Sequence, residues 1–241
     1  MRKRTIVALS IAASLVVLGG IIFVGAMSQV KWDLNSVSFN KRETNEYVIS
    51  EAYQSIRIIT RTANVVVLPA EDGATKVICK EQERLKHTVA VREGTLVIEL
   101  TDTRDWKDYL FDFASTKITV YVPAVELNTV SVQNNTGNVK ISDLSCTDCS
   151  VKNSTGNVLL QNVLVTDELS VTNSTGNVKF KDCDGGEVFV KNSTGDIEGN
   201  FLTGKYFAAK SSTGDVEVPE SVTGGRCELT TATGNISITI G

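Results

Sequence analysis

The stretch Asn153-Ser-Thr-Gly-Asn157 decides the fold, because versions of it return at a fixed spacing through the second half of the chain. Similar phrases begin at Asn134, Asn173 and Asn192, and looser ones at Ser211 and Thr231. Their glycines follow one another at steps of 19 or 20 residues: Gly137, Gly156, Gly176, Gly195, Gly214 and Gly234. A period this regular is typical of a stacked repeat architecture, with these glycines at the repeat corners.

Apolar and polar residues alternate on both sides of each glycine. Five residues before the glycine stands an apolar residue such as Val171, and two residues after it stands another, such as Val178. The residues between them are mostly polar. A period of two indicates half-buried strands that meet at a corner.

Two all-β architectures fit this pattern. In an antiparallel meander, each Thr-Gly-Asn would be a hairpin turn. In a β-solenoid, each repeat of 19–20 residues is one coil, and equivalent residues stack about 4.8 Å apart. Stacking gives the repeated asparagines a role, because side-chain amides in register hydrogen-bond along a column. We therefore expect an all-β fold with a single-chain β-solenoid over residues 128–241.

Residues 47–127 are predicted to hold a degenerate first coil and a capping β insertion. Thr62-Ala63-Asn64 replaces the glycine phrase in the first coil. Four further segments alternate, with Glu93-Gly94 as a hairpin turn between the middle two. These segments are Lys76–Lys80, Thr88–Val91, Thr95–Leu100 and Lys117–Val122. We expect antiparallel strands here to cap the open end of the stack.

The N-terminal residues 1–27 are predicted to form a cytoplasmic basic stub and one transmembrane helix. Ile6–Met27 is free of charge for 22 residues, which is long enough to span a bilayer. Positive charges precede it, so the repeats would lie outside the cell membrane, after a juxtamembrane tether at 28–46. The alternative is a cleaved signal peptide, with Val24-Gly25-Ala26 at the cleavage site.

An aromatic cluster interrupts the alternation between residues 101 and 116. Its members are Trp106, Tyr109, Phe111 and Phe113. They would either pack over the end of the rod or form a partner-binding loop, since exposed aromatic residues mark interfaces.

Few residues suggest chemistry, and we predict no catalytic residue, cofactor or metal ligand. Asp196 and Asp215 hold equivalent positions in neighbouring repeats, so stacking would place them about 5 Å apart, as in a retaining glycosidase. Asparagine fills that column elsewhere, which favours a solvated acidic stripe. Cys146 and Cys149 form a Cys-x-x-Cys pair, for which buried structural thiols, a local disulfide and metal or redox chemistry remain open.

The chain resembles a bacterial family of β-strand-repeat "putative adhesin" (toast-rack) proteins of unknown function. The resemblance rests on the anchor, Ile56–Leu68, Gly94–Leu100, Lys117–Pro123 and the serial Thr-Gly-Asp/Asn units, over about residues 45–241. It implies a repetitive β-rod on the bacterial envelope and supplies no catalytic residues.

Two functions remain. The first is a non-enzymatic extracytoplasmic module for adhesion, scaffolding or envelope sensing, whose partner is an envelope protein or polysaccharide. The second is a carbohydrate-active enzyme that uses Asp196 and Asp215. Residues 128–241 carry 13 Asp and Glu against 8 Lys and Arg, which argues against a nucleic-acid partner.

Overall fold

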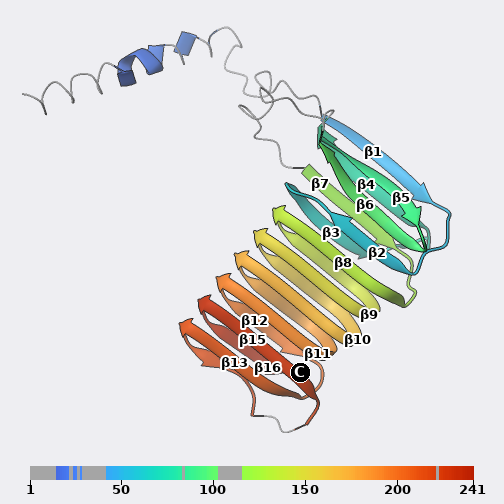
Figure 1. Cartoon of the computed structure of the whole chain (residues 1–241), viewed down its shortest axis with the longest axis vertical. Coiled ribbons are helices and arrows are strands. Elements are labelled where there is room, and N and C mark those ends of the chain that lie inside the picture. Colours follow the sequence, from blue (N-terminus) through green and yellow to red (C-terminus); the bar gives the residue numbers. More distant parts are fainter. Residues whose placement is uncertain are drawn as a thin grey trace, which may run out of the picture. The chain divides into compact units, whose positions relative to one another are not determined.

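The computed structural model describes residues 15–21, 24–25, 28, 42–82, 85–102, 116–220 and 223–241. Residues 15–21, 24–25 and 28 are helical. The strands formed by the other described residues all belong to one sheet of sixteen strands (Figure 1). All the strands belong to one compact unit, Arg42–Thr103 with Ala114–Gly241. The all-β class is therefore confirmed.

The first seven strands come from the part of the chain before the regular repeats. They are β1 (Arg42–Ile49), β2 (Ser55–Ile59), β3 (Ala63–Pro69), β4 (Thr75–Gln82), β5 (Leu85–Arg92), β6 (Thr95–Asp102) and β7 (Thr116–Val122). Glu93 and Gly94 turn the chain between β5 and β6, as predicted, and both have positive φ.

The nine remaining strands come from the repeats. They are β8 (Leu127–Thr136), β9 (Val139–Thr155), β10 (Val158–Thr175), β11 (Val178–Thr194), β12 (Ile197–Phe201), β13 (Lys205–Thr213), β14 (Val216–Glu217), β15 (Gly225–Thr233) and β16 (Ile236–Ile240). β9, β10 and β11 each run from one glycine corner to the next, and bend on the way at Asp143, Asn162 and Asp182, whose φ is near +50°.

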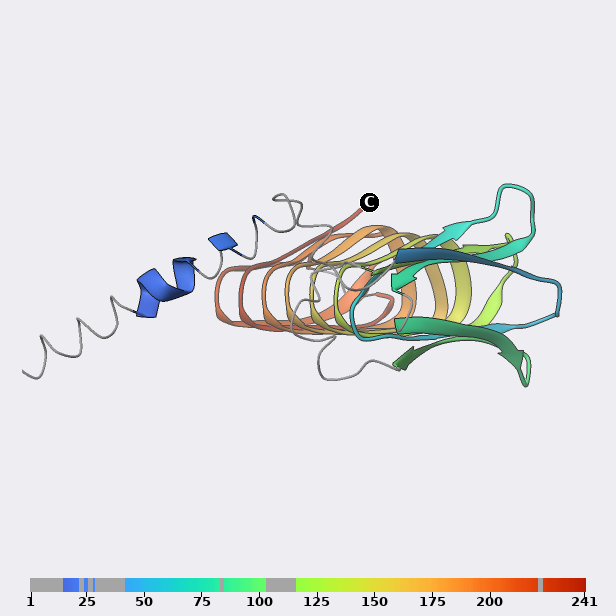
Figure 2. The same ribbon diagram turned by 90° about the horizontal axis from the view of Figure 1, so that it is seen from above.

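Each corner residue joins two strand segments into what we call a winding, named after that residue. Equivalent positions of adjacent windings pair in parallel and in register, for example Val171 with Val151 and Val190. Figure 2 shows the windings one behind another around a shared interior. Alternate side chains fill this interior, and Val171 and Val178 are both 0% exposed.

The windings do not follow one another in chain order. β15 pairs with β11 on one side and with β13 on the other, and β16 lies between β12 and β14. The last winding, at Gly234, therefore lies between the Gly195 and Gly214 windings. The order along the sheet is Ala63, Gly137, Gly156, Gly176, Gly195, Gly234 and Gly214.

The strands before the repeats extend the sheet. β7 adds in parallel to β3, and β6 adds in parallel to β2. β4 then pairs with β7, β5 pairs with β6, and β4 meets β5 at one residue pair, Gln82 with Leu85. The pairings close a ring of eight strands, in the order β9, β3, β7, β4, β5, β6, β2 and β8.

The predicted fold class is wrong beyond its all-β class. We expected a β-solenoid of coils stacked in chain order, closed by a separate antiparallel cap. The described residues instead form one sheet with a closed ring of eight strands, the expected cap belongs to that ring, and the last two windings are exchanged. The physical reason is that β6 and β7 hydrogen-bond to the free edges of β2 and β3 rather than cover them, and β5 and β4 continue the sheet from there.

The predicted transmembrane helix has no support in the structure. Among the described residues, no helix combines the length and the apolar character needed to cross a membrane, and most of Ile6–Met27 lies outside them. The aromatic cluster of Trp106, Tyr109, Phe111 and Phe113 also lies outside the described residues.

Candidate functional site

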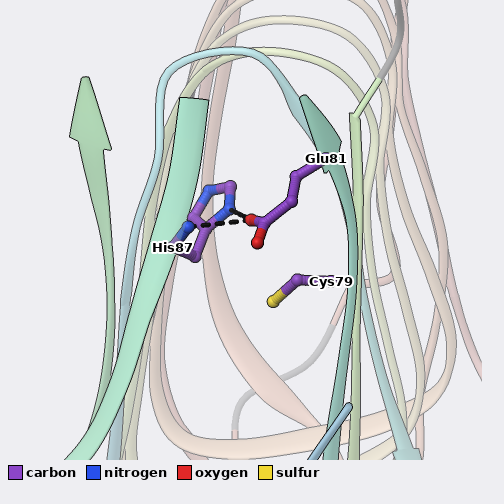
Figure 3. A group of neighbouring side chains, drawn as sticks. All are labelled: Cys79, Glu81 and His87. Atoms are coloured by element: carbon purple, nitrogen blue, oxygen red, sulfur yellow. Dashed lines mark hydrogen bonds and ion pairs between the residues drawn. The ribbon is translucent and has the colours of Figure 1, made fainter. Parts of the chain in front are cut away.

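Three side chains of different chemistry meet inside the closed ring: Cys79 and Glu81 on β4, and His87 on β5 (Figure 3). One ligand atom from each residue lies within 4.8 Å of the other two. Strand parity places them there, because Cys79 and Glu81 share the inward parity of Val77 on β4, with the exposed Lys80 between them, and His87 stands between two exposed residues on β5. β4 and β5, which are neighbours in the ring, thus direct these side chains toward one another in its interior.

Hydrogen bonds fix the carboxylate and the imidazole. Glu81 Oε2 lies 2.7 Å from His87 Nδ1 and accepts the His87 backbone N–H at 2.8 Å. The other carboxylate oxygen accepts from the Asn45 side-chain amide of β1 at 2.7 Å. His87 Nε2 lies 3.0 Å from the hydroxyl of Thr60. The side chains of Glu81 and His87 are 0% and 1% exposed.

These surroundings change the acidity of both acidic groups in the cluster. Burial raises the pKa of the Glu81 carboxyl, but hydrogen bonds from His87 and Asn45 outweigh it and hold the pKa below its ordinary value. Burial, with the nearby Glu81 carboxylate, raises the pKa of the Cys79 thiol to about 12. Without a bound cation, the cluster therefore holds a carboxylate beside a protonated thiol at neutral pH.

Thr60, His87 and Glu81 form a hydroxyl–imidazole–carboxylate series, the arrangement that activates a nucleophile in hydrolases. Thr60 is only 4% exposed, however, so a polymeric substrate does not reach its hydroxyl. The series therefore gives no support to an enzyme. The chemistry open to the cluster is proton sharing or binding of an ion small enough to be enclosed.

Sequence reasoning missed this cluster, because it looked for chemistry only at Asp196 with Asp215 and at Cys146 with Cys149. The sequence nevertheless contained a feature that could have indicated the cluster. Glu81 has the same strand parity as Val77 and Cys79, so an ionisable residue occupies an inward position in an otherwise apolar series.

The expected carboxylate pair is not formed. The residues that follow the corners make what we call the corner column, in which each side-chain oxygen accepts the backbone N–H of the next member at 2.8–3.0 Å. Its order is Asn64, Asn138, Asn157, Asn177, Asp196, Asn235 and Asp215. Asn235 therefore separates Asp196 from Asp215, and the proposed glycosidase geometry is absent at this pair.

The asparagines three residues before the corners also have a structural role, through their side-chain N–H groups. Asn134, Asn153, Asn173 and Asn192 are 1–3% exposed. Each donates its side-chain N–H groups to two corner carbonyls, one in its own winding and one in the adjacent winding. Contact between the amides themselves is secondary, as between Asn153 and Asn173 at 3.3 Å.

All five cysteines are buried and free of disulfides, including Cys146 and Cys149. Cys149 and Cys227 occupy the inward position that Val188 and Leu169 hold in other windings. Four cysteines thus lie in the repeat core, and Cys79 alone lies beside a carboxylate and an imidazole.

The parallel windings, their corner glycines and their polar columns define a repetitive all-β protein. The sequence profile of the Toastrack DUF4097 family matches residues 53–241, and the chain belongs to this family. The comparison with curated proteins gave no match.

Solved structures that match this chain include two with low sequence identity and TM-scores below 0.5. A "putative cell adhesion protein" from Clostridium sporogenes is 11% identical, with a TM-score of 0.49, and the alignment covers 83% of this chain and 100% of that chain. A "putative adhesin" from Bacteroides fragilis is 19% identical, with a TM-score of 0.44, and the alignment covers 83% and 97% of the two chains. The family assignment therefore rests on the sequence profile.

Proposed function

We propose that the protein is a non-enzymatic, extracytoplasmic binding module that acts in bacterial adhesion or envelope scaffolding, with an anionic envelope polysaccharide as its partner. The observation that carries this proposal is a row of polar side chains four residues before the corners. In sheet order the row, which we call the lysine row, is Gln133, Lys152, Thr172, Lys191, Thr230 and Lys210.

The lysine row supports binding of an extended, negatively charged chain. Its members stand on adjacent strands, which are about 4.8 Å apart, so the three lysines form a regular line of positive charge. The lysines are exposed, and Thr172 is half-buried. None of this requires a catalytic cleft.

A shallow hollow of about 290 Å³ borders the row and adds an aromatic contact. It is lined by Ser170, Val171, Thr172, Phe189, Val190, Lys191, Glu228 and Thr230. Phe189 is half-buried there, with the Arg226 guanidinium 5.7 Å from its ring centre. An aromatic ring beside hydroxyl and ammonium groups suits the mixed apolar and polar faces of a sugar residue.

The experiment compares two variants of the full-length chain with equal charge change. One carries Lys152→Gln, Lys191→Gln and Lys210→Gln, and the control carries Lys140→Gln, Lys179→Gln and Lys181→Gln beyond the corners. We expect purified acidic envelope polysaccharide to bind the wild type and the control, and to lose binding to the first variant. Equal loss in both variants, or retention of an envelope protein in place of the polysaccharide, contradicts the proposed partner.

A further inference from the structure

We propose that Cys79, Glu81 and His87 bind one zinc ion between β4 and β5. Their donor atoms lie within 4.8 Å of one another, and all three residues are buried. The three donors come from two neighbouring strands of the ring, and their side chains point toward one another (Figure 3). This inference is independent of the lysine row and of the proposed adhesion.

The types of donor atom favour zinc over other divalent metals. A thiolate, an imidazole and a carboxylate are the three side-chain ligands that zinc uses, usually in a tetrahedron. Magnesium and calcium take oxygen ligands and do not favour the sulfur of Cys79. Three protein donors leave the fourth position of a zinc tetrahedron to water or another small donor.

Charge balance favours a divalent cation here. Binding removes the proton from the Cys79 thiol and releases it to solvent, so that the thiolate and the Glu81 carboxylate together carry two negative charges. Zinc supplies two positive charges, while a neutral His87 adds none. The completed site is therefore neutral, which is what a buried group of ions needs in order to avoid a large desolvation cost.

Neighbouring residues hold two of the ligands in the orientation that a metal requires. The Thr60 hydroxyl contacts His87 Nε2, and the Asn45 amide donates to Glu81 Oε1. These contacts direct His87 Nδ1 and Glu81 Oε2 toward each other. A zinc ion between Nδ1 and Oε2 would replace their 2.7 Å hydrogen bond. The Nδ1 proton would then be carried by Nε2, which would donate to the Thr60 hydroxyl, so His87 stays neutral and the outer contacts persist as orienting interactions.

The sheet also offers a route to the site. Among the residues that the structure describes, β4 and β5 pair only at Gln82 with Leu85, whereas β4 pairs along its length with β1, and β5 along its length with β6. Separating β4 from β5 beside the cluster therefore breaks few backbone hydrogen bonds. A short opening at this point lets an ion reach the side chains without unfolding of the windings.

The test titrates the full-length chain, stripped with a chelator and kept reduced in detergent, with zinc and then with cobalt(II). We expect one zinc ion per chain, a rise in melting temperature that the chelator reverses, and a thiolate-to-cobalt charge-transfer absorption. Cys79→Ala and His87→Gln should abolish stoichiometric binding. Thr60→Val, which removes only the orienting hydroxyl, should weaken zinc binding by about 10–100-fold.

Cys227→Ala is the matched control, because it also truncates a fully buried cysteine thiol but lies in the repeat core. It should keep the zinc stoichiometry and the cobalt absorption of the wild type. Absence of stoichiometric zinc binding in the wild type overturns the proposal, as does a cobalt–thiolate band that survives Cys79→Ala. If Cys79→Ala does not fold, loss of the band in Cys227→Ala, or its absence in the wild type, refutes the site.

Discussion

At the scale of single residues, each corner glycine leaves space for a backbone carbonyl of the adjacent winding. A Cβ on Gly176 would lie 2.2 Å from the Gly156 carbonyl oxygen, and φ at Gly176 is +122°. We predict that Gly176→Ala lowers the free energy of unfolding by about 2–5 kcal/mol, through strain and overlap together. Urea denaturation measures this change.

Gly73→Ala is the control for strain alone, because φ is +70° there but nothing lies within 4 Å of the added Cβ. It should cost about 1–2 kcal/mol. Equal losses for the two variants would show that the close approach of the windings contributes nothing.

The corner column makes a second prediction at this scale. Asp196 accepts the Asn235 N–H through a side-chain oxygen, and Asn provides the same acceptor in the other windings. The Asp196→Asn, Asp215→Asn double variant should therefore change the free energy of unfolding by no more than about 0.5 kcal/mol. Calorimetric melting of both proteins checks this.

The same double variant tests the absence of catalysis at the two aspartates. Neither it nor the wild type should cleave purified envelope polysaccharides, because Asn235 separates the two carboxylates. Cleavage by the wild type alone would restore the enzyme hypothesis.

Glu81 gives a pH dependence whose sign follows from its hydrogen bonds. Its pKa is lower in the folded chain than the ordinary value of 4.5, so the unfolded chain binds the proton more tightly. The stabilisation is complete above about pH 4.5 and is lost as the pH falls through the lower folded pKa. Measured with a chelator present, Glu81→Gln should flatten this acid limb of the melting-temperature curve. An unchanged acid limb would contradict the shift.

At the scale of elements, alternation along each repeat predicts which side chains are buried. Val171 is 0% exposed, and Val171→Asp should cost several kcal/mol because it buries a charge without a partner. Thr172 pairs with Lys152 and Lys191, so Thr172→Asp places its carboxylate between two ammonium groups. Thr172→Asp should change the free energy of unfolding by no more than about 0.5 kcal/mol. Melting curves of the two variants measure the difference. Equal melting temperatures would contradict the assignment of inner and outer faces.

Strand positions were predictable at this scale, whereas strand partners were not. The segments Lys76–Lys80, Thr95–Leu100 and Lys117–Val122 all lie within strands of the structure. Their alternation says which face is buried but carries no information on the neighbouring strand, because backbone hydrogen bonds are the same for any partner. The site of Cys79, Glu81 and His87 depends on which strands are neighbours. Strand parity could therefore show which of these residues point inward, but not that they lie close together.

At the scale of the whole molecule, the regular repeats predict that the chain forms windings, but they do not predict the order in which the windings stack. Leu229, Ala209 and Val190 hold equivalent positions, so the Gly234 and Gly214 windings offer similar contacts to the Gly195 winding. Serial order was the simplest reading of a regular period. The exchange becomes visible only in the hydrogen bonds that join β15 to both β11 and β13.

Engineered disulfides test this order in the folded protein, because a bridge requires Cα atoms within about 7 Å. Lys191 pairs with Thr230, and Thr230 pairs with Lys210. Lys191 and Lys210 are two strand spacings apart, which is about 9.6 Å.

We expect a disulfide to form readily in two double variants, Lys191→Cys with Thr230→Cys and Thr230→Cys with Lys210→Cys. The double variant Lys191→Cys with Lys210→Cys should stay reduced. Serial stacking reverses the outcome for the two pairs that contain Lys191, since it places Lys191 beside Lys210 and Thr230 one strand further on. The pair of Thr230 and Lys210 is adjacent in both orders and serves as the positive control. Mobility on non-reducing gels and mass spectrometry of the bridged peptides distinguish the two orders, with the five native buried thiols as a common background.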